Sequence, residues 1–502
     1  MSDQNDAFLQ EIQSDPEDIV PRLVYADWLE ENGDPLADLI RVQCELADLP
    51  VDSPDRAELV QHERELLIEH RQKIVEPLQK FSPHALGVNR GFVESIRLDA
   101  DVLIDNADEI VQLLPGLCSL TIRKSGKHLD ELIKLPQLEH IKSLSLGMAG
   151  LQNGGVQKLL SSPHWSGLVE LNLRGNDLTV IGLRWLSECE AMSGLRRLDL
   201  SLNQVTTQGL ALIRKSEFFQ NLQHLAVAEC RISQIVEGLR GDGLPRLESL
   251  DLTHTDLNES KTARLIETDR SYRTLILNKA ADFGKAAAAR LGRARSTASL
   301  QHLEMSRAAV KVAGVKSVLA DGGLPAIEYL SAAGQRTLRL DGKVSSQKGT
   351  SSSPRFLDLS DNGINDRTLP GILRSGIFAR TVDLNLRRNK LTDASIPVLL
   401  ESDHTPELRR LHLAGNNLSD FVLSDLAKLP KLRQLERITL DRPMLARRDA
   451  FRKFFESPHR NPFVQLAVPT ESGASRTETR INMIDRIVSQ LGEDVRGILE
   501  VI

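Results

Sequence analysis

The chain has 502 residues, of which 41% are hydrophobic and 26% charged, and its formal net charge is −6 with acidic and basic residues interspersed. The length suggests about three ordinary domains. The charge pattern offers no basic field for nucleic acid, and no apolar run of about 18 residues could span a membrane. The four scattered cysteines exclude a zinc or disulfide framework. Together with an N-terminus that lacks signal-peptide features, they favour the reducing cytoplasm.

The first part of the chain is predicted to be helical, with breaks at proline and glycine residues. The helices are expected over residues 6–13, 17–32, 35–48 and 54–79. The stretch Ile19–Leu29 is apolar nearly all round, so we expect this helix to be buried. Asp27 would be costly there unless paired, and Arg41 in the next helix is the expected partner.

Two aromatic residues stand out in this part, because the chain has only three Tyr and three Trp. Tyr25 and Trp28 lie in the segment LVYADWLEENGDPLADLIRVQCEL, from Leu23 to Leu46. We expect both to be core or capping residues that support the rest of the fold. A patch that binds a partner is the alternative.

A leucine period organises most of the remaining chain. The segments LVELNLRGNDLT from Leu168, LRRLDLSLNQVT from Leu195 and LRRLHLAGNNLS from Leu408 all fit L-x-x-L-x-L-x-x-N-x-L, the leucine-rich repeat pattern. The third apolar position recurs from Leu98 to Val468, with eight of fourteen intervals equal to 27 residues and the others between 24 and 28. This regularity indicates a repeat array.

Each repeat combines two kinds of periodicity. L-x-x-L-x-L alternates like a short strand with one buried face, and the second half has apolar residues at helical spacing. Neither half buries its apolar face alone, so repeats stack. Strands pack more closely than helices, which bends the array with its strands inside. We predict an α/β leucine-rich-repeat solenoid with a curved parallel sheet of about 15 strands inside and helices outside, resembling the ribonuclease-inhibitor type.

Asparagines recur at one position of this repeat. At the bend after the strand, an amide satisfies backbone groups of the neighbouring turn, so we interpret them as scaffold. These residues are Asn176, Asn203, Asn362, Asn389 and Asn416, with Cys230 as a replacement. In one repeat the helix gives way to DGKVSSQKGTSSSP, residues 341–354. Its composition predicts a mobile loop on the convex side, with regulatory phosphorylation as an alternative role.

The segment before the repeats also resembles a known family. FLQEIQSDPEDIVPRLVYADWLEENGDPLADLIRVQCELADL, followed by ERELLIEHRQKIVEPL and RGFVESIRLDADVL, is similar to the repeat-companion domain of planctomycete bacteria over about the first 105 residues. The resemblance implies a non-catalytic helical module that caps leucine-rich repeats. We expect its last helix to lead directly into the first strand, near Ser95–Leu98, and to cover the open sheet edge there.

We therefore predict three domains: an all-α cap at 1–90, the repeat array at 91–470, and a linker with an amphipathic helix at 471–502. Apolar residues from Ile481 to Ile502 alternate at three and four residues, as in a heptad seam. The helix is expected either to dock on the last repeat as a second cap or to mediate self-association.

No phosphate-binding loop, zinc-protease motif, nucleophile elbow or EF-hand loop is present. We expect no enzyme, cofactor or metal. The leading interpretation is a cytoplasmic scaffold that binds a protein partner, with neither nucleic acid nor membrane as a ligand. One alternative is a regulator of an enzyme, since the array resembles Ran GTPase-activating proteins at fold level. A structural spacer is another.

The binding surface is expected on the concave face, where the polar residues between the leucines point away from the core. An acidic middle between arginines would steer a partner with a basic patch. Ordinary solvated strand positions are the alternative. The residues singled out are Asn172, Arg174, Arg197, Asp199, Asp251, Glu304, Asp358, Asn385, Arg387, Arg410 and His412.

Overall fold

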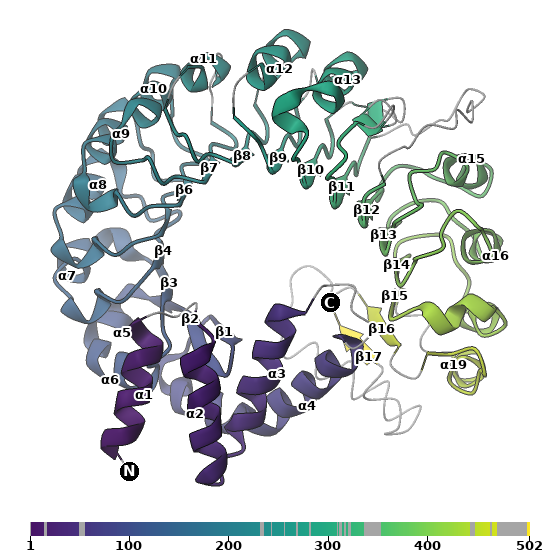
Figure 1. The fold of residues 1–502 in the computed structure, drawn as a ribbon, viewed down its shortest axis with the longest axis horizontal. Coiled ribbons are helices and arrows are strands. Elements are labelled where there is room, and N and C mark those ends of the chain that lie inside the picture. Colours follow the sequence, from purple (N-terminus) through teal and green to yellow (C-terminus); the bar gives the residue numbers. More distant parts are fainter. Residues whose placement is uncertain are drawn as a thin grey trace. The chain divides into compact units, whose positions relative to one another are not determined.

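The computed structural model describes most of the chain in two compact units, Met1–Asp251 and Leu252–Ile502. In each unit the strands line the inner side of the chain's path and the repeat helices the outer side (Figure 1). Within the described ranges, we find no helix with the length and apolar character that a bilayer crossing requires. These ranges are 2–14, 18–49, 56–230, 235–241, 243–255, 257–267, 270–280, 283–308, 310, 314–315, 318–319, 323–335, 353–441, 447–461, 464–468 and 499–501.

Four helices open the first unit, as predicted. They are α1 (Ser2–Ser14), α2 (Val20–Glu31), α3 (Leu36–Asp48) and α4 (Arg56–Val75), and a 3-10 turn, η1 (Glu76–Phe81), follows them. Tyr25 is buried, and Trp28 packs against the same cluster together with Phe8 and Phe92. The expectation that Tyr25 and Trp28 support the fold is confirmed.

The expectation that α2 is buried on all sides is wrong. Val20 and Val24 are 61% and 47% exposed. The buried face instead follows the spacing 22, 25, 26 and 29, and therefore includes a charged residue, Arg22. Asp27 lies on the exposed side, where its Oδ1 accepts a hydrogen bond from Arg41 Nη2 at 2.8 Å. The predicted pair exists, but it is a surface pair.

A β-hairpin connects the helices to the first repeat. Strand β1 (Ala85–Asn89) pairs antiparallel with β2 (Phe92–Asp99). Arg90 and Gly91 between them have φ angles of 47° and 82°, the left-handed values that a tight type I′ turn requires. The prediction that the last helix leads directly into the first strand and covers its edge is therefore wrong. A strand covers the edge of β2, because only a strand can pair its row of N–H and C=O groups.

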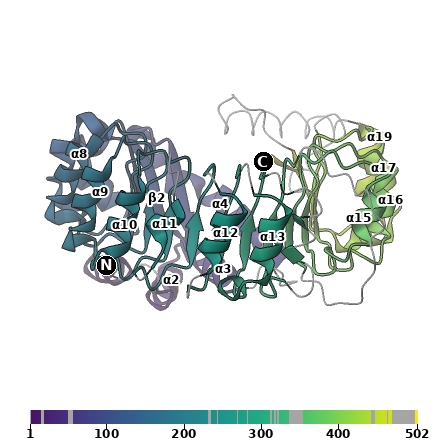
Figure 2. The same cartoon turned by 90° about the horizontal axis from the view of Figure 1, so that it is seen from above.

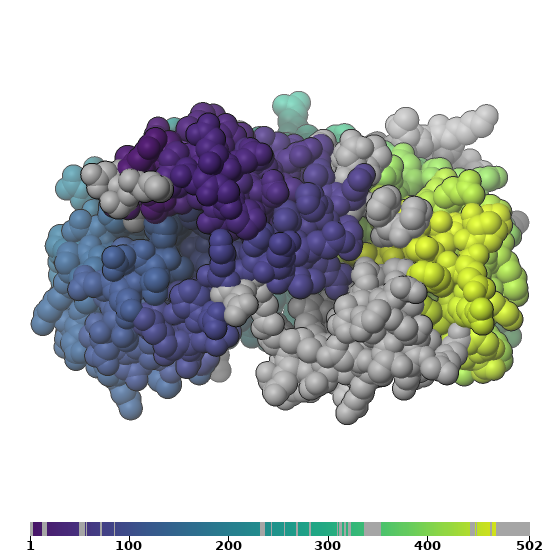
Figure 3. All heavy atoms as spheres, turned by 90° about the horizontal axis from the view of Figure 1, so that it is seen from below, coloured from purple at the N-terminus to yellow at the C-terminus, as the bar shows by residue number. Residues whose placement is uncertain are grey.

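A buried ion pair fastens the helices to this hairpin. Arg22 is fully buried, and its Nη2 donates to Glu94 Oε1 at 2.6 Å. Its guanidinium also lies 5.2 Å from the centre of the Phe92 ring. Asn89 Nδ2 donates to the other Glu94 oxygen at 2.8 Å, and Gln43 Oε1 accepts the Gly91 N–H at 2.6 Å. The helical cap and the first repeats consequently form one continuous surface (Figure 3).

The rest of the first unit consists of repeats in which parallel strands follow one another in chain order. From β2 to β8, each strand pairs in parallel with the next. The strands are β3 (Ser119–Arg123), β4 (Ser143–Ser145), β5 (Glu170–Asn172), β6 (Arg197–Asp199), β7 (His224–Ala226) and β8 (Ser249–Asp251). The helices are α5 (Ala100–Asp105), α6 (Ala107–Leu113), α7 (Leu129–Leu132), α8 (Gln152–Leu160), α9 (Val180–Ser187), α10 (Thr207–Lys215) and α11 (Ile235–Leu239). The 3-10 turns are η2 (Ser125–Lys127), η3 (Pro136–Leu138), η4 (Pro163–Trp165) and η5 (Glu190–Met192).

The second unit repeats this plan, with parallel pairing from β9 to β17. Its strands are β9 (Thr274–Ile276), β10 (His302–Glu304), β11 (Tyr329–Ser331), β12 (Phe356–Asp358), β13 (Asp383–Asn385), β14 (Arg410–His412), β15 (Arg437–Thr439), β16 (Gln465–Val468) and β17 (Leu499–Val501). Its helices are α12 (Glu259–Ile266), α13 (Lys285–Arg293), α15 (Leu369–Leu373), α16 (Ser395–Leu400), α17 (Val422–Leu426) and α19 (Arg448–Phe455), with 3-10 turns η6 (Arg295–Thr297) and η8 (Pro430–Gln434). Helices α15, α16, α17 and α19 pack in succession (Figure 2).

Two predicted segments fall largely outside the described residues. Of the Ser-rich segment 341–354, the structure describes only Ser353 and Pro354, which are buried. Of the predicted C-terminal helix it describes only Leu499–Val501, which form strand β17 beside β16 instead of a helical turn. The domain boundaries at 90 and 470 stay predictions.

The recurrent asparagines connect neighbouring repeats, as expected. Asn203 Oδ1 accepts the N–H groups of Asn176 and Leu178 at 2.9 and 3.0 Å. Its Nδ2 donates to the Leu173 and Leu200 carbonyls, both at 2.9 Å. Asn389 and Asn416 bond in the same way in the second unit. We name the residues at this repeat position the turn ladder.

The turn ladder has more exceptions than the one predicted. Cys230 Sγ donates to the Leu200 carbonyl at 3.4 Å, so it reproduces only part of the asparagine pattern. Thr255 likewise donates to the Leu252 carbonyl, at 2.6 Å. Ala280 and Ala308, at the next two positions, have no polar side-chain group. Gln335 then resumes the pattern by accepting from Val310 N–H.

The buried pair at the cap generates a first prediction. Arg22→Met should lower the free energy of unfolding by about 3–5 kcal/mol, because Glu94 would be left buried without its main partner. Arg41→Met is the matched control, since Arg41 pairs with exposed carboxylates and such surface pairs contribute about 1 kcal/mol or less. Urea unfolding followed by circular dichroism measures both. Equal losses in the two variants would contradict a special role for the buried pair.

The turn ladder generates a second prediction. Asn416→Ala should cost about 1–3 kcal/mol of stability, because it leaves backbone groups of two repeats unpaired. The adjacent Asn417 is exposed, so Asn417→Ala should change stability by no more than about 0.5 kcal/mol. Thermal unfolding of both variants tests this, and an Asn417→Ala loss as large as that of Asn416→Ala would refute it.

Candidate functional site

The inner face of each sheet carries two side chains per strand. The central residue of nearly every short strand is buried in the core, and its two neighbours are mostly half-buried. Because side chains alternate across a strand, both neighbours point to the side opposite the helices. The register aligns them in columns. In the second unit the first column is His302, Tyr329, Phe356, Asp383, Arg410 and Arg437, and the second is Glu304, Ser331, Asp358, Asn385, His412 and Thr439.

The predicted site residues are divided between the two units. In the first unit, Asn172, Asp199 and Asp251 share one column with Ala226. Arg197 Nη1 pairs with Glu170 Oε1 at 3.1 Å, and Arg174 Nη2 lies 3.8 Å from Glu229 Oε1. The remaining residues are in the second unit: Glu304, Asp358, Asn385, Arg387, Arg410 and His412.

Several of these side chains have a structural partner directly after their own strand. Asp199 Oδ1 accepts the Ser201 N–H at 2.8 Å, and Asp358 Oδ1 accepts the Ser360 N–H at 2.8 Å. Asn172 and Asn385 accept the N–H groups of the arginines two residues on, at 2.9 and 3.1 Å. Such Asx turns stabilise the chain reversal. These acceptors therefore shape the turn in addition to presenting polar atoms to the solvent.

Glu304 belongs to a local cluster. His302 Nε2 lies 2.9 Å from Glu304 Oε1, and Asn278 Nδ2 donates to Oε2 at 2.6 Å. The hydrogen bond with His302 is the main cause that lowers the pKa of Glu304, burial opposes it, and Asn278 lowers it further. The cluster holds Glu304 ionised and fixes the orientation of the His302 ring.

Three stacked rings were missed, because in these repeats only residues of the second column were singled out from the sequence. The His302 and Tyr329 rings are parallel within 5°, with centres 4.1 Å apart, and the Tyr329 and Phe356 ring centres are 6.5 Å apart. Arg410 continues the stack, with its guanidinium 5.4 Å from the Phe356 ring centre. We name these four residues the aromatic column. The signal was readable: His, Tyr and Phe precede the buried leucine in three successive repeats of a chain with 4% Phe, Trp and Tyr.

The aromatic column is uncharged at Tyr329. Burial, and then the nearby Glu304, Asp358 and Asp383 carboxylates, raise the pKa of the phenol to about 12. Asp383 follows Phe356 in the first column, where its Oδ2 forms an ion pair with Arg410 Nε at 3.1 Å and its Oδ1 lies 3.1 Å from His412 Nε2. His412 Nδ1 is also 2.7 Å from Thr439 Oγ1. Arg410 and His412 are thus oriented by neighbouring repeats.

Arg387 differs from these paired residues. It lines a depression of about 380 Å³ at the turns that follow β11 to β15. Burial is the main cause that lowers the pKa of its guanidinium. Its Nε atom is buried and has no hydrogen-bond partner among the described residues. The depression also includes Arg307, Ala333, Gly334, Ser360, Asp361, Asn385, Arg388, Ala414, Gly415 and Asp441.

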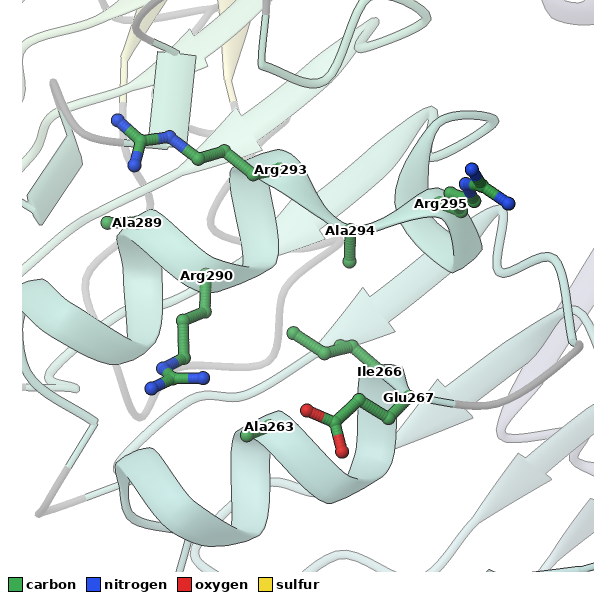
Figure 4. Close-up of a pocket in the computed structure, with 8 residues that line it drawn as sticks. All are labelled: Ala263, Ile266, Glu267, Ala289, Arg290, Arg293, Ala294 and Arg295. Atoms are coloured by element: carbon green, nitrogen blue, oxygen red, sulfur yellow. The ribbon is translucent and has the colours of Figure 1, made fainter.

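A second depression, of about 530 Å³, lies on the helical side between α12 and α13. Figure 4 shows small and apolar side chains from both helices, with Arg290 reaching toward α12 and Arg295 pointing away. Arg290 Nε pairs with Glu259 Oε1 at 3.1 Å. This cation therefore already has a partner within the protein.

Neither depression has the composition of a metal centre. In the part of the chain that the structure describes, no group of three or more His, Cys, Asp and Glu side chains could hold a metal ion. What the inner face offers is a column of rings, paired charges and one half-buried arginine, which suit the recognition of another surface.

Comparisons with known proteins agree with this architecture. Two family models match single repeats: Leucine Rich repeat at residues 194–213 and Leucine Rich Repeat at residues 407–429. A search of curated proteins found no significant match. The chain contains leucine-rich repeats, and its fold is an α/β leucine-rich-repeat solenoid with a helical N-terminal cap.

Similar solved structures include chains from three complexes. In the mouse RP105/MD-1 complex, the match has 20% identity and a TM-score of 0.33, and covers 81% of this chain and 55% of that one. In the yeast Rad7 and Elc1 complex, the match has 17% identity and a TM-score of 0.42, and covers 83% of this chain and 98% of that one. In the complex of the Arabidopsis thaliana receptor kinase GASSHO1/SCHENGEN3 ectodomain with CASPARIAN STRIP INTEGRITY FACTOR 2, the match has 17% identity and a TM-score of 0.31. It covers 72% of this chain and 46% of that one. The present chain thus spans about half of the mouse and plant chains.

The Glu304 cluster generates a prediction on pH. Because the pKa of Glu304 is lowered in the folded state, its ionisation stabilises the fold above the ordinary Glu pKa of about 4.3. This contribution is lost as the pH falls from there through the lowered folded-state pKa, since the unfolded chain takes up its proton first. The difference in unfolding free energy between wild type and Glu304→Gln should therefore shrink on acidification.

Chemical denaturation at pH ~7 and at pH ~3.5, on either side of the ordinary Glu pKa, measures this difference. Glu401→Gln, which removes an exposed carboxylate in another repeat, is the control and should change stability little at either pH. A difference for Glu304→Gln that stays constant between the two conditions would rule out the proposed linkage.

Proposed function

We propose that this protein is a non-enzymatic scaffold that binds a protein partner on the inner, concave face of its repeats. The observation that carries the proposal is the aromatic column, because it places His302, Tyr329 and Phe356 together on the face opposite the helices. Half-buried rings that remain accessible on a sheet face are a cost to a free protein and a source of affinity in a complex.

The composition of this face supports the same proposal. Tyr, Phe and Arg are enriched at the centres of protein interfaces, and residues that dominate binding energy are often Trp, Tyr or Arg. In the second unit, strands β9 to β17 at a spacing of about 4.8 Å would span roughly 40 Å. That length suits an ordinary protein interface.

The residues singled out from the sequence are part of this proposal. Asp251, Asp358 and Glu304 supply negative charge, and Arg174, Arg197 and Arg410 supply positive charge, which would set the rate and specificity of encounter. Since Asp199 and Asp358 also hold their turns, their charges are best removed by replacement with Asn, which keeps the Oδ1 acceptor.

Finer aspects of the proposal come from the sequence pattern alone. The resemblance of the cap to the repeat-companion domain, and of the repeats to the ribonuclease-inhibitor type, supports an interaction protein of the cytoplasm. Regulation of an enzyme such as a GTPase would be one use of the same face, and a structural spacer would leave the face without a ligand.

The test compares two phenylalanines of the second unit. Phe356 lies in the aromatic column, whereas Phe421 lies on the helical side, is 47% exposed and stacks on Arg447. Proteins retained from lysate by the immobilised wild type should also be retained by Phe421→Ala, and should be lost with Phe356→Ala or Tyr329→Ala. Quantitative mass spectrometry of the retained proteins measures this, with circular dichroism to verify that each variant is folded.

A further arm replaces Asp199, Asp251 and Asp358 by Asn together. Slower association at low salt, with the difference reduced at higher salt, would agree with electrostatic steering. Retention that is lost with Phe421→Ala and is indifferent to Phe356→Ala and Tyr329→Ala would place the interface on the helical side and contradict the proposal.

A further inference from the structure

Arg387 is a half-buried cation, and the Asp358 and Asp383 carboxylates are near enough to act on it electrostatically. Its Nε is buried without a hydrogen-bond partner, and we find no ion pair between its guanidinium and any described residue. Asp441, on the rim of the same depression, uses Oδ2 to accept the Gly415 N–H at 2.8 Å. Withdrawing a guanidinium from water without a partner is unfavourable. The folded protein accepts part of this cost at Arg387.

The same local sequence occurs in the first unit with a different outcome. LNLRGN (171–176) places Arg174 as LNLRRN (384–389) places Arg387, and both arginine N–H groups are held by the preceding Asn. Arg174 Nη2, however, lies 3.8 Å from Glu229, two repeats further on. At the corresponding position of the second unit the sequence has Arg442, which lies outside the described residues and cannot supply an anion.

Small residues keep the space beside Arg387 open. Ala333, Gly334, Ala414 and Gly415 line the depression. A Cβ atom at Gly415 would lie 3.0 Å from Arg388 Cγ, and the φ angle of +78° there also favours glycine. The depression thus combines a guanidinium with room for an incoming group.

From these observations we infer that the depression around Arg387 binds a side-chain carboxylate of the protein partner. The inference rests on the proposed function and names the chemistry of the partner: an acidic residue beside an aromatic or apolar one, the latter for the adjoining aromatic column. A guanidinium matches a carboxylate with two parallel N–H donors.

The charge of the depression favours a carboxylate over a phosphate group. Three arginines (Arg307, Arg387 and Arg388) and two aspartates (Asp361 and Asp441) line it. This leaves one positive charge in excess, which balances a monoanion. A phosphate group, with a charge near −2 at neutral pH, would remain unbalanced beside the two aspartates.

The first test uses acetate as the probe, so that no partner is needed. Sodium acetate should raise the unfolding midpoint of the full chain above its value in sodium chloride of equal ionic strength, in a saturable manner. The effect should disappear in Arg387→Met and persist in Arg174→Met, the matched control. Arg387→Met should itself be at least as stable as wild type in chloride, because it removes a cation without a partner.

Three results would overturn the inference. The first is an acetate effect that survives in Arg387→Met or is absent from wild type. The second is a lower midpoint of Arg387→Met in chloride, which would give Arg387 a structural role. The third is a larger saturable effect of phosphate than of acetate at equal ionic strength, which would make the group a phosphate.

A second test separates this inference from the proposed function. Retention of the partner should weaken about ten-fold or more in Arg387→Met and change little in Arg290→Met, which removes a cation from the helical side. If Phe356→Ala abolishes retention while Arg387→Met does not, the concave interface stands and the carboxylate site is wrong. If neither variant affects retention, the proposed function itself fails.

Discussion

Most repeats have to reverse the chain after a strand of only three residues, and this reversal leaves backbone N–H and C=O groups in the protein interior without a strand partner. Unpaired, these groups would cost more than the short strand gains. The recurrent asparagines remove this cost. The amides of Asn176, Asn203, Asn389 and Asn416 each accept from one turn and donate to the carbonyls that follow two strands. Asn362 accepts from Gln335 and donates to the Ala332 carbonyl. The sheet, the outward helices and the inner columns of side chains all depend on these turns.

Side chains of the inner face also stabilise these turns. Asp358 and Asn385 hold the turns from the solvent side, while the turn ladder holds them from the core side. Register brings His302, Tyr329 and Phe356 side by side, and the Glu304 cluster orients the His302 ring.

Features that repeat with the period were predictable from the sequence, and features that join distant segments were not. The strand anchors, the helices over residues 17–48 and the Asp27–Arg41 pair followed from local patterns. The Arg22–Glu94 pair joins residues 72 positions apart, so no local pattern in the sequence indicated it. The hairpin at Arg90 and Gly91 was missed, because the last helix of the cap was expected to lead directly into the first strand.

The candidate site shows the same division. The repeat pattern alone placed Asn385 at the end of a strand and Arg387 in the turn that follows it. The pattern could not show that Arg387 lacks an ion-pair partner such as the one that Arg174 has. That difference depends on residues two repeats away. The aromatic column could have been read from the sequence, but of its four residues only Arg410 had been singled out there.

At Cys230 the turn ladder has a thiol, a group that can be modified chemically, in place of an asparagine amide. Its thiol is 3% exposed and burial raises its pKa to about 11, so in the closed structure it is neither ionised nor within reach of an alkylating reagent. Its modification requires the turn to open. The rate of alkylation at the Cys230 sulfur therefore measures how often this one repeat unfolds locally while the rest of the array stays folded.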